Sequence, residues 1–245
     1  MTNHEISSSS SAYRQPRRSC VKAGHSVVIF LILGVASFAA SPPSAQEILE
    51  SVRMLESRER LDLQGQLREK ENVIPFHLSQ NGPLIRYSFE NPEETLQLRL
   101  GESGSRLEVV SDEGPETVPA TKLEQKIRDT GITYEDLALK FLYWPGGRVL
   151  GDETIHARSC WKVQLQAPSR TSQYSMVLLW ADKSSGALMR IEGYDWNGKL
   201  SKRFEVVAAQ KIENRWFLKQ MRVEELDPGS GKVQSRTYLE IKKKR

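Results

Sequence analysis

The spacing of apolar residues changes twice along the chain. Residues 45–60 place Ile48, Val52 and Leu55 on one helical face, which predicts an amphipathic helix. From residue 61 to residue 111, apolar residues mostly recur at every second position in five short segments. Turn-forming pairs such as Asn-Gly and Asn-Pro separate these segments. We therefore expect five strands joined by tight turns.

A helical interlude follows these strands. Residues 120–129 and 133–144 each have a helical pattern. Thr133 is a good N-cap and Asp136 stands three residues later, an acidic variant of the capping box. Pro145 and the glycines after it should end this helix. Nearly every side chain between these signals is apolar, whereas a surface helix normally has one apolar stripe and one wet face.

Two-residue alternation returns in seven further segments between residues 148 and 242, again with short turns between them. Short links are typical of an antiparallel meander. About twelve strands are too many for a flat open sheet, so we predict a mainly β (α+β) fold with a strongly curved sheet. The apolar helix can fill its concave face in two ways: it lines a ligand cavity, or it plugs the core. The sequence leaves both open.

Residues 1–45 have the order of a secretory signal peptide and spacer. A basic start with Arg14, Arg17, Arg18 and Lys22 precedes an apolar run over 27–40, and small residues follow. The run is short for a membrane span, although an uncleaved anchor is the alternative. We expect export out of the cytoplasm and a single domain over 46–245. Because no cysteine stands directly after the apolar run, we expect no lipid anchor.

Charge gives little reason to expect a nucleic-acid partner. The chain has 35 basic and 31 acidic side chains, but residues 46–245 keep 31 and 30, a net charge of +1. The closing KKKR, 242–245, is most simply a solvated tail. Contact with phosphate or a membrane surface is the alternative for this tail.

No group of residues points to catalysis. GESGS at 101–105 reads as a hairpin turn rather than a nucleophile elbow, because antiparallel strands flank it. After residue 45 the only histidines are His77 and His156, too few for a structural zinc site. Cys160 stands alone there and should be a shielded, unreactive thiol, although strict alternation places it on the wetter face. We predict no enzyme activity, metal or cofactor.

Three stretches resemble the outer-membrane lipoprotein-sorting proteins of the LolA-like superfamily. The matching features are a helix ending in aromatic-Trp-Pro, the strand pair VLGDETIHARSCWKVQL, the strand end Trp180–Lys183 and the hairpin YDWNGKL. The similarity covers about 110 residues within TYEDLALKFLYWPGGRVLGDETIHARSCWKVQLQAP, YSMVLLWADKSSGALMRIEGYDWNGKLSKRFEV and FLKQMRVEELDPGSGKVQSRTYLEI.

The resemblance implies an incomplete antiparallel β-barrel of about 11–12 strands, with helices as a lid over the concave apolar face. Better-known members shield the acyl chains of lipoproteins, and a basic residue near the lid holds it closed through helix-loop carbonyls. Arg128 and Arg148 flank the helix here, but neither matches that position. An envelope sensor or adaptor of the same fold, binding an amphiphile and a protein partner, is the alternative function.

The predicted function is that of a soluble periplasmic carrier for lipoprotein acyl chains or lipid, in exchange with a membrane-protein donor and acceptor. Alternation fixes which strand residues share a face but not which face is concave. The residues expected at the cavity and lid are Leu137, Phe141, Leu142, Trp144, Val177, Leu179, Met189, Ile191 and Met221.

Overall fold

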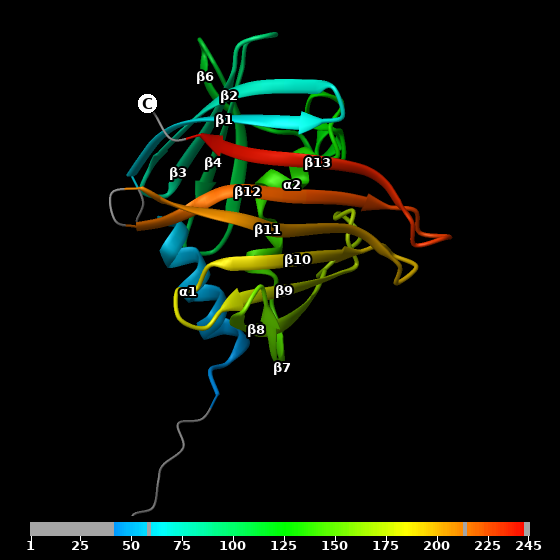
Figure 1. Ribbon diagram of the computed structural model, residues 1–245. Coiled ribbons are helices and arrows are strands. Elements are labelled where there is room, and N and C mark those ends of the chain that lie inside the picture. The colour runs from blue at the N-terminus through cyan, green and yellow to red at the C-terminus, as the bar shows by residue number, and fades with distance from the viewer. Residues whose placement is uncertain (1–41, 58–59, 213–214, 243–245) are drawn as a thin grey trace, which may run out of the picture. The chain divides into compact units, whose positions relative to one another are not determined.

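The computed structural model describes residues 42–57, 60–212 and 215–242 (Figure 1). Contacts group Pro42–Arg245 into one compact unit. The predicted signal peptide falls on residues 1–41 and so lies outside the described residues. None of the helices within the described ranges is long and apolar enough to cross a membrane.

Within the described residues, thirteen antiparallel strands form one open, curved sheet, which confirms the prediction of an incomplete barrel. The strand missed by the pattern is β6 (Gly114–Thr117), which has only four residues. The others are β1 (Arg60–Glu69), β2 (Asn72–Asn81), β3 (Leu84–Phe89), β4 (Glu94–Leu100), β5 (Ser105–Ser111), β7 (Arg148–Ile155), β8 (Arg158–Gln166), β9 (Met176–Asp182), β10 (Leu188–Tyr194), β11 (Leu200–Ile212), β12 (Arg215–Leu226) and β13 (Val233–Lys242).

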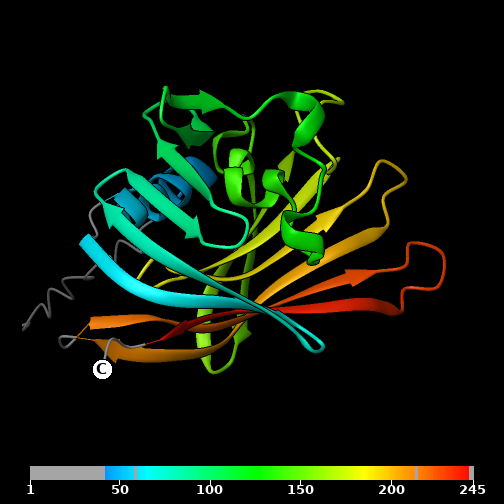
Figure 2. The same ribbon diagram turned by 90° about the horizontal axis from the view of Figure 1, so that it is seen from above.

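The sheet consists of two meanders that join where the first strand pairs with the last. The strand order is β6-β5-β4-β3-β2-β1-β13-β12-β11-β10-β9-β8-β7. Leu67 in β1 opposes Leu239 in β13, for example. Strands β6 and β7 are therefore the two edges, although they are neighbours in sequence. The segment between them, residues 118–147, has to cross the concave side (Figure 2).

Two apolar clusters fill the concave side. The first lies between strands β1–β5, β12 and β13 and the first part of the crossing segment, where Ile127 and Ala138 are fully buried. The second lies between strands β8–β10, the helix α1 (Ala45–Ser57) and the later part of that segment. A third, small cluster around Cys160 and Trp180 lies on the opposite face of β8 and β9.

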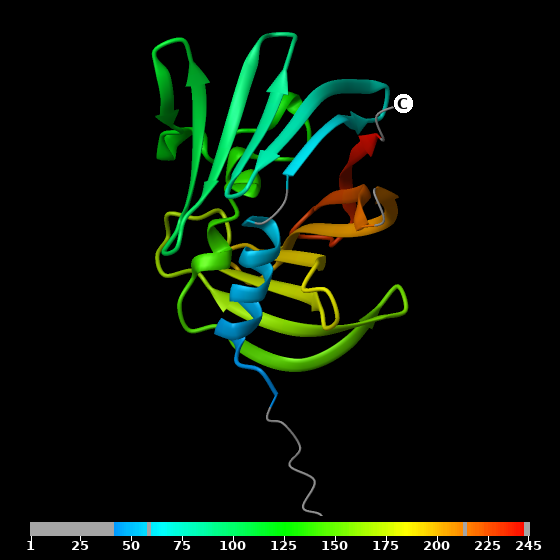
Figure 3. The ribbon, with the colours of Figure 1, turned by 90° about the vertical axis from the view of Figure 1, so that its left-hand side faces the viewer.

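Helix α1 packs as its pattern predicts. Ile48, Leu49 and Val52 are each at most 3% exposed and belong to the second cluster. Figure 3 shows α1 running alongside the strands of this half of the sheet. The side chain of Leu55 lies outside the described set.

The helix predicted over 120–129 does not form. Two single 3₁₀ turns stand in its place, η1 (Ala120–Lys122) and η2 (Ile127–Asp129). Arg128 adopts a left-handed conformation, with φ of 54°, and this prevents a continuous helix. Ile127 nevertheless points into the first cluster, so the apolar pattern indicated burial correctly while the element type was wrong.

Candidate functional site

The lid segment, Thr133–Trp144, begins as the sequence predicts. The Thr133 hydroxyl accepts a hydrogen bond from the Asp136 amide at 3.3 Å, and the Asp136 carboxylate accepts one from the Thr133 amide at 2.8 Å. This reciprocal pair is the capping box, with aspartate in the glutamate position. It starts the helix α2 (Tyr134–Ala138).

The lid segment is not one helix, contrary to prediction. Leu139 adopts φ of 50° and ψ of 29°, so α2 ends after Ala138 and a 3₁₀ turn, η3 (Lys140–Tyr143), follows. A left-handed leucine costs about 1–2 kcal/mol, which packing has to offset. Leu139 contacts both concave clusters.

This break explains why the lid segment is apolar nearly all round. Leu137, before the break, packs against the first cluster. Phe141, Leu142 and Trp144, after it, are at most 8% exposed and belong to the second cluster. The two pieces thus face different parts of the core. Residues 137, 141 and 144 therefore do not share one helical face, because the helix is broken at Leu139.

A buried polar network fixes the first piece of the lid to the sheet. The Lys202 ammonium of β11 donates to the Asp136 carboxylate at 2.7 Å, and both side chains are at most 5% exposed. The Tyr174 hydroxyl donates to the same carboxylate at 2.6 Å, and the Gln173 side-chain amide donates at 3.2 Å. The Gln173 backbone amide donates to Glu135 at 2.9 Å.

Burial sets the protonation preferences within this network. Burial raises the pKa of the Tyr174 hydroxyl well above its usual value, and the neighbouring Asp136 carboxylate adds to this shift. Burial also raises the pKa of Glu135, although hydrogen bonds from Ser172 and Gln173 oppose it. Tyr174 therefore stays protonated and acts as a donor. The network suits structural fixation more than proton transfer.

Polar groups on other elements hold two backbone carbonyls of the lid segment. Arg53 of α1 donates from Nη1 to the Leu142 carbonyl at 2.6 Å, and its guanidinium lies 4.9 Å from the Tyr143 ring centroid. Ser105 of β5 donates to the Ala138 carbonyl. The Tyr143 hydroxyl in turn donates to the Gly101 carbonyl at 3.0 Å. The second piece is thus attached to α1 and to the β4–β5 turn, and the end of the first piece to the start of β5.

The structure brings together most of the residues expected at the cavity. Val177, Leu179 and Ile191 lie in the second cluster with Phe141, Leu142 and Trp144. Leu137 and Met221 are half-buried at the first cluster. The set therefore divides between two neighbouring parts of the concave side.

Met189 lies on the opposite face of the sheet. Leu188 opposes Ala181 and Arg190 opposes Trp180, so Met189 is the extra residue of a β-bulge. It packs against the third cluster, beside Leu178 and Trp180. The bulge shifts the alternation by one, and this is why Met189 and Ile191 do not share a face.

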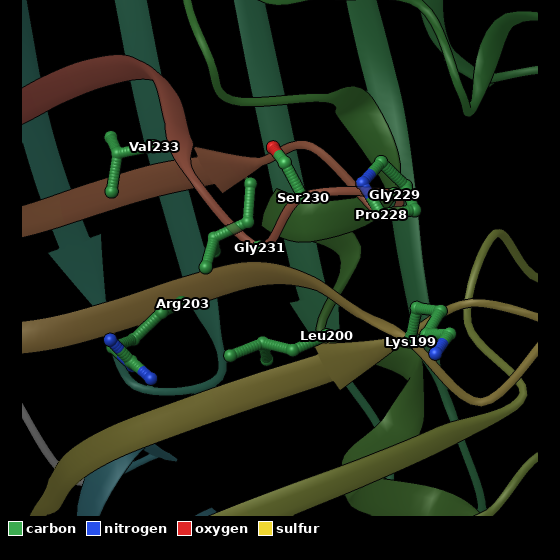
Figure 4. A pocket seen from close by; sticks show the side chains of 9 residues that line it. Lys199, Leu200, Arg203, Pro228, Gly229, Ser230, Gly231 and Val233 are labelled. Carbon is green, nitrogen blue, oxygen red and sulfur yellow. The ribbon is translucent and has the colours of Figure 1, made fainter.

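The clearest hollows among the described residues lie away from these side chains. One of about 480 Å³ lies between the β10–β11 and β12–β13 turns and is lined by Lys199, Leu200, Arg203 and Val233, among others (Figure 4). The other, about 340 Å³, lies between α1 and the β9–β10 turn. Neither is lined by a residue of the lid segment, whose Phe141, Leu142 and Trp144 are packed in the second cluster.

Cys160 is shielded, as the sequence indicated, and His77 lies in a strand, whereas His156 lies in a turn. Cys160 is fully buried in the third cluster, and burial raises the pKa of its thiol. His77 contacts Asp62 at 2.8 Å, and His156, in the β7–β8 turn, contacts Glu205 at 3.1 Å. Each histidine therefore has a single acidic neighbour, as expected of a satisfied surface residue.

Comparison with protein families gives a match over more than half of the chain. The matching family is described as "-like: Uncharacterized protein", and the match covers residues 113–245. The chain belongs to this family. No curated protein matches the sequence significantly.

Solved structures identify the fold. A DUF1329 family protein from Desulfovibrio piger has a TM-score of 0.61 at 17% identity, over 81% of this chain and 90% of that one. A protein named as an outer membrane lipoprotein-sorting domain, from Vibrio parahaemolyticus, has a TM-score of 0.61 at 14% identity, over 81% and 92%. A LolA superfamily protein from Nitrosomonas europaea has a TM-score of 0.57 at 18% identity, over 82% and 93%. The fold is LolA-like.

Sequence reasoning missed Arg53 and Lys202. Arg53 stands four residues after Leu49, which is buried in the second cluster, and its side chain is only 14% exposed. Lys202 shares a strand face with Phe204, which packs against both concave clusters. In both cases the available signal was a cation placed among inward-facing apolar positions. Such a residue rarely stays buried without a partner.

Proposed function

We propose that this protein is a carrier that shields acyl chains of lipoproteins or lipids beneath its lid segment. The LolA-like fold supports this proposal, since one protein of that fold is named for lipoprotein sorting. The observation that carries the proposal is the second piece of the lid. Phe141, Leu142 and Trp144 cover the second cluster, while two hydrogen-bonded carbonyls attach the segment to neighbouring elements.

An acyl chain has enough burial energy to displace this cover. Each methylene taken from water contributes roughly 0.8 kcal/mol, so a chain of about 16 carbons gains roughly 12 kcal/mol. Lifting the second piece uncovers Val177, Leu179 and Ile191 of the sheet. The ligand then takes the place of the lid side chains against these residues.

The moving part begins at Leu139. The buried Asp136–Lys202 pair holds α2 in place, whereas η3 is attached through Arg53 and Tyr143. Leu139 already has a left-handed conformation, and residues that absorb backbone rotation are typical of hinges. Arg53 then holds the closed state through the Leu142 carbonyl, the role that a basic residue has in better-known LolA-like carriers.

The test is uptake of a fluorescent fatty acid by the wild type and an Arg53→Ala variant. Loss of the hydrogen bond to Leu142 should raise the uptake rate severalfold, while the thermal midpoint falls only slightly. Arg60→Ala, which removes an exposed arginine from the start of β1, is the matched control and should behave as wild type. Equal uptake rates in all three proteins would exclude Arg53 as the closing contact.

A second measurement asks whether there is a ligand at all. Mass spectrometry of material that co-purifies with the wild type should detect lipid or acylated protein. No lipid, together with no probe uptake, would mean that the lid is a plug and the carrier proposal is wrong. Recovery of a protein partner without an acyl chain would favour the sensor or adaptor function.

The proposal includes export by residues 1–45 and action in the periplasm, between a membrane-protein donor and acceptor. It assigns binding rather than catalysis to the concave side. The buried carboxylates there serve structure, because Asp136 is neutralised by Lys202 and Glu135 accepts a backbone amide.

A further inference from the structure

Strands β11 and β12 extend beyond their neighbours as a two-stranded arm. The pairing of β10 with β11 ends at Arg190 and Glu205, but β11 continues for seven more residues to Ile212. The pairing of β12 with β13 ends at Gln220 and Glu240, while β12 begins at Arg215. We call residues 206–212 and 215–219 the arm. At about 3.3 Å per residue it reaches roughly 20 Å past the edge of β10.

The arm is rich in apolar residues that are not fully buried. It contains Val206, Val207, Ala208, Ala209, Ile212, Trp216, Phe217 and Leu218, and none of its described side chains falls into the buried class. Ile212 and Leu218 are half-buried against the first cluster. Trp216 is 71% exposed, more than any other large apolar side chain among the described residues. An exposed apolar surface of this kind usually marks an interaction site.

Basic residues surround this apolar surface. Lys211 opposes Trp216 across the arm, and Lys219 is three residues further along β12; both lysines are exposed. The sequence adds Arg215, while Glu213 is the one acid between residues 206 and 221.

The last strand ends beside the arm. The Gln210 side-chain amide donates to the Ile241 carbonyl of β13 at 3.0 Å, and the three ribbon views place the end of β13 on the same side as the arm. Lys242 follows Ile241 directly, and the sequence continues with Lys243, Lys244 and Arg245. This end of the sheet therefore combines the exposed indole of Trp216 with three exposed lysines, Lys211, Lys219 and Lys242.

We propose that the arm docks the protein on an anionic lipid bilayer. Tryptophan favours the interface between headgroups and acyl chains, where its ring is partly dehydrated and its N–H remains hydrated. Lysines near an anionic surface add an attraction that acts within a Debye length. The arm offers both chemistries at one protruding end. The surface docked is the bilayer itself, which is a separate question from what lies under the lid.

The experiment is co-sedimentation of the full chain with vesicles of phosphatidylcholine, alone or with about three parts phosphatidylglycerol in ten. The wild type should prefer the anionic vesicles, and added salt should weaken its binding. Trp216→Glu and the double variant Lys211→Glu with Lys219→Glu should each lower the partition coefficient by about tenfold. Trp216→Phe should keep it within about threefold of wild type, because phenylalanine retains the apolar ring.

Matched controls make the same changes at the opposite end of the sheet. Val73→Glu places a charge on an exposed apolar strand residue there, and Lys199→Glu with Lys232→Glu reverses the same number of charges. All proteins carry the same residues 1–41, so differences between them report the arm. The controls should bind as wild type.

Three outcomes would overturn the proposal. The wild type could show no preference for anionic vesicles, or the controls could lose as much binding as the arm variants. The arm variants could also bind vesicles normally while changing the oligomeric state, which would make the arm a contact between copies of the chain. Thermal midpoints near that of the wild type establish that each variant is folded.

Discussion

Asp136 occupies the most constrained position in the lid. Its carboxylate accepts from Lys202, Tyr174, Gln173 and the Thr133 amide, so nearly all of its lone pairs are used. In a low-dielectric site, a partly satisfied group of this kind is worse than an apolar one. The consequences of substitution therefore depend on what is left unpaired.

Asp136→Asn should destabilise the protein by about 3–5 kcal/mol, because Lys202 is left as an unpaired buried charge. Adding Lys202→Met removes that charge and should recover at least half of the loss. The free energy of unfolding in urea measures both effects. A loss no larger than that of a surface substitution would show that Lys202 finds another partner or water.

Gly193 supports the same network through close packing. A Cβ at this position would lie 2.3 Å from a ring carbon of Tyr174, whose hydroxyl donates to Asp136. Gly193→Ala should therefore cost about 1–3 kcal/mol, the usual range for overpacking. Gly104→Ala is the matched control, since nothing lies within 4 Å of its Cβ. Equal thermal midpoints for the two variants would contradict the packing argument.

Residue-level features were predictable where their causes are local. The Thr133 capping box and the shielding of Cys160 follow from a few neighbouring residues, and both are confirmed. The pairing of Asp136 with Lys202 spans 66 residues, so no local pattern indicates it. The displacement of Met189 depends on a bulge that the alternation does not reveal.

At the scale of elements, the β9–β10 turn depends on one carboxylate. Asp182 accepts two hydrogen bonds from the Arg158 guanidinium at 2.9 Å, and others from Ser184 and Ser185. Burial opposes ionisation of Asp182, but these donors outweigh it and hold its pKa far below the usual range. The turn and the neighbouring strand β8 are thus joined through a group that titrates only in acid.

Stability should fall in acid through this group. In the unfolded chain the Asp182 carboxylate binds a proton near pH 3.8, whereas in the folded protein it does so only at lower pH. The contribution of Asp182 to the free energy of unfolding is therefore complete above pH 3.8 and is lost as the pH falls below that value. Asp182→Asn should reduce the wild-type dependence of the free energy of unfolding on pH below about 4. Asp112→Asn, at an exposed turn residue, is the control. A slope unchanged by Asp182→Asn would contradict the assignment.

For the lid segment, the sequence predicted where it begins and ends but not the break inside it. Capping and terminating residues located both ends of the segment correctly. The break at Leu139 was not predictable, because leucine has no preference for positive φ and only tertiary packing selects it. The break also places Phe141 and Leu142 in the second cluster. Both are packed in the closed state, so a carboxylate there should impair folding as well as ligand retention.

At the scale of the molecule, strands were easier to predict than their order. Alternation located twelve of the thirteen strands, because one face of each strand is buried more than the other. The pairing of β1 with β13 joins residues that lie between 168 (Glu69 and Thr237) and 178 (Gln64 and Lys242) positions apart, and short turns do not predict it. That pairing nevertheless decides which strands are edges, and hence that residues 118–147 cross the concave side.

This crossing has a mechanical consequence. The sheet is curved and open, and residues 118–147 connect its two edge strands, β6 and β7, across the concave side. Flattening the curved sheet would increase the distance between its two edge strands, so the length and attachments of residues 118–147 limit how far the sheet can open. Under the proposed carrier function, a ligand that widens the sheet would therefore also act on the lid segment that covers it.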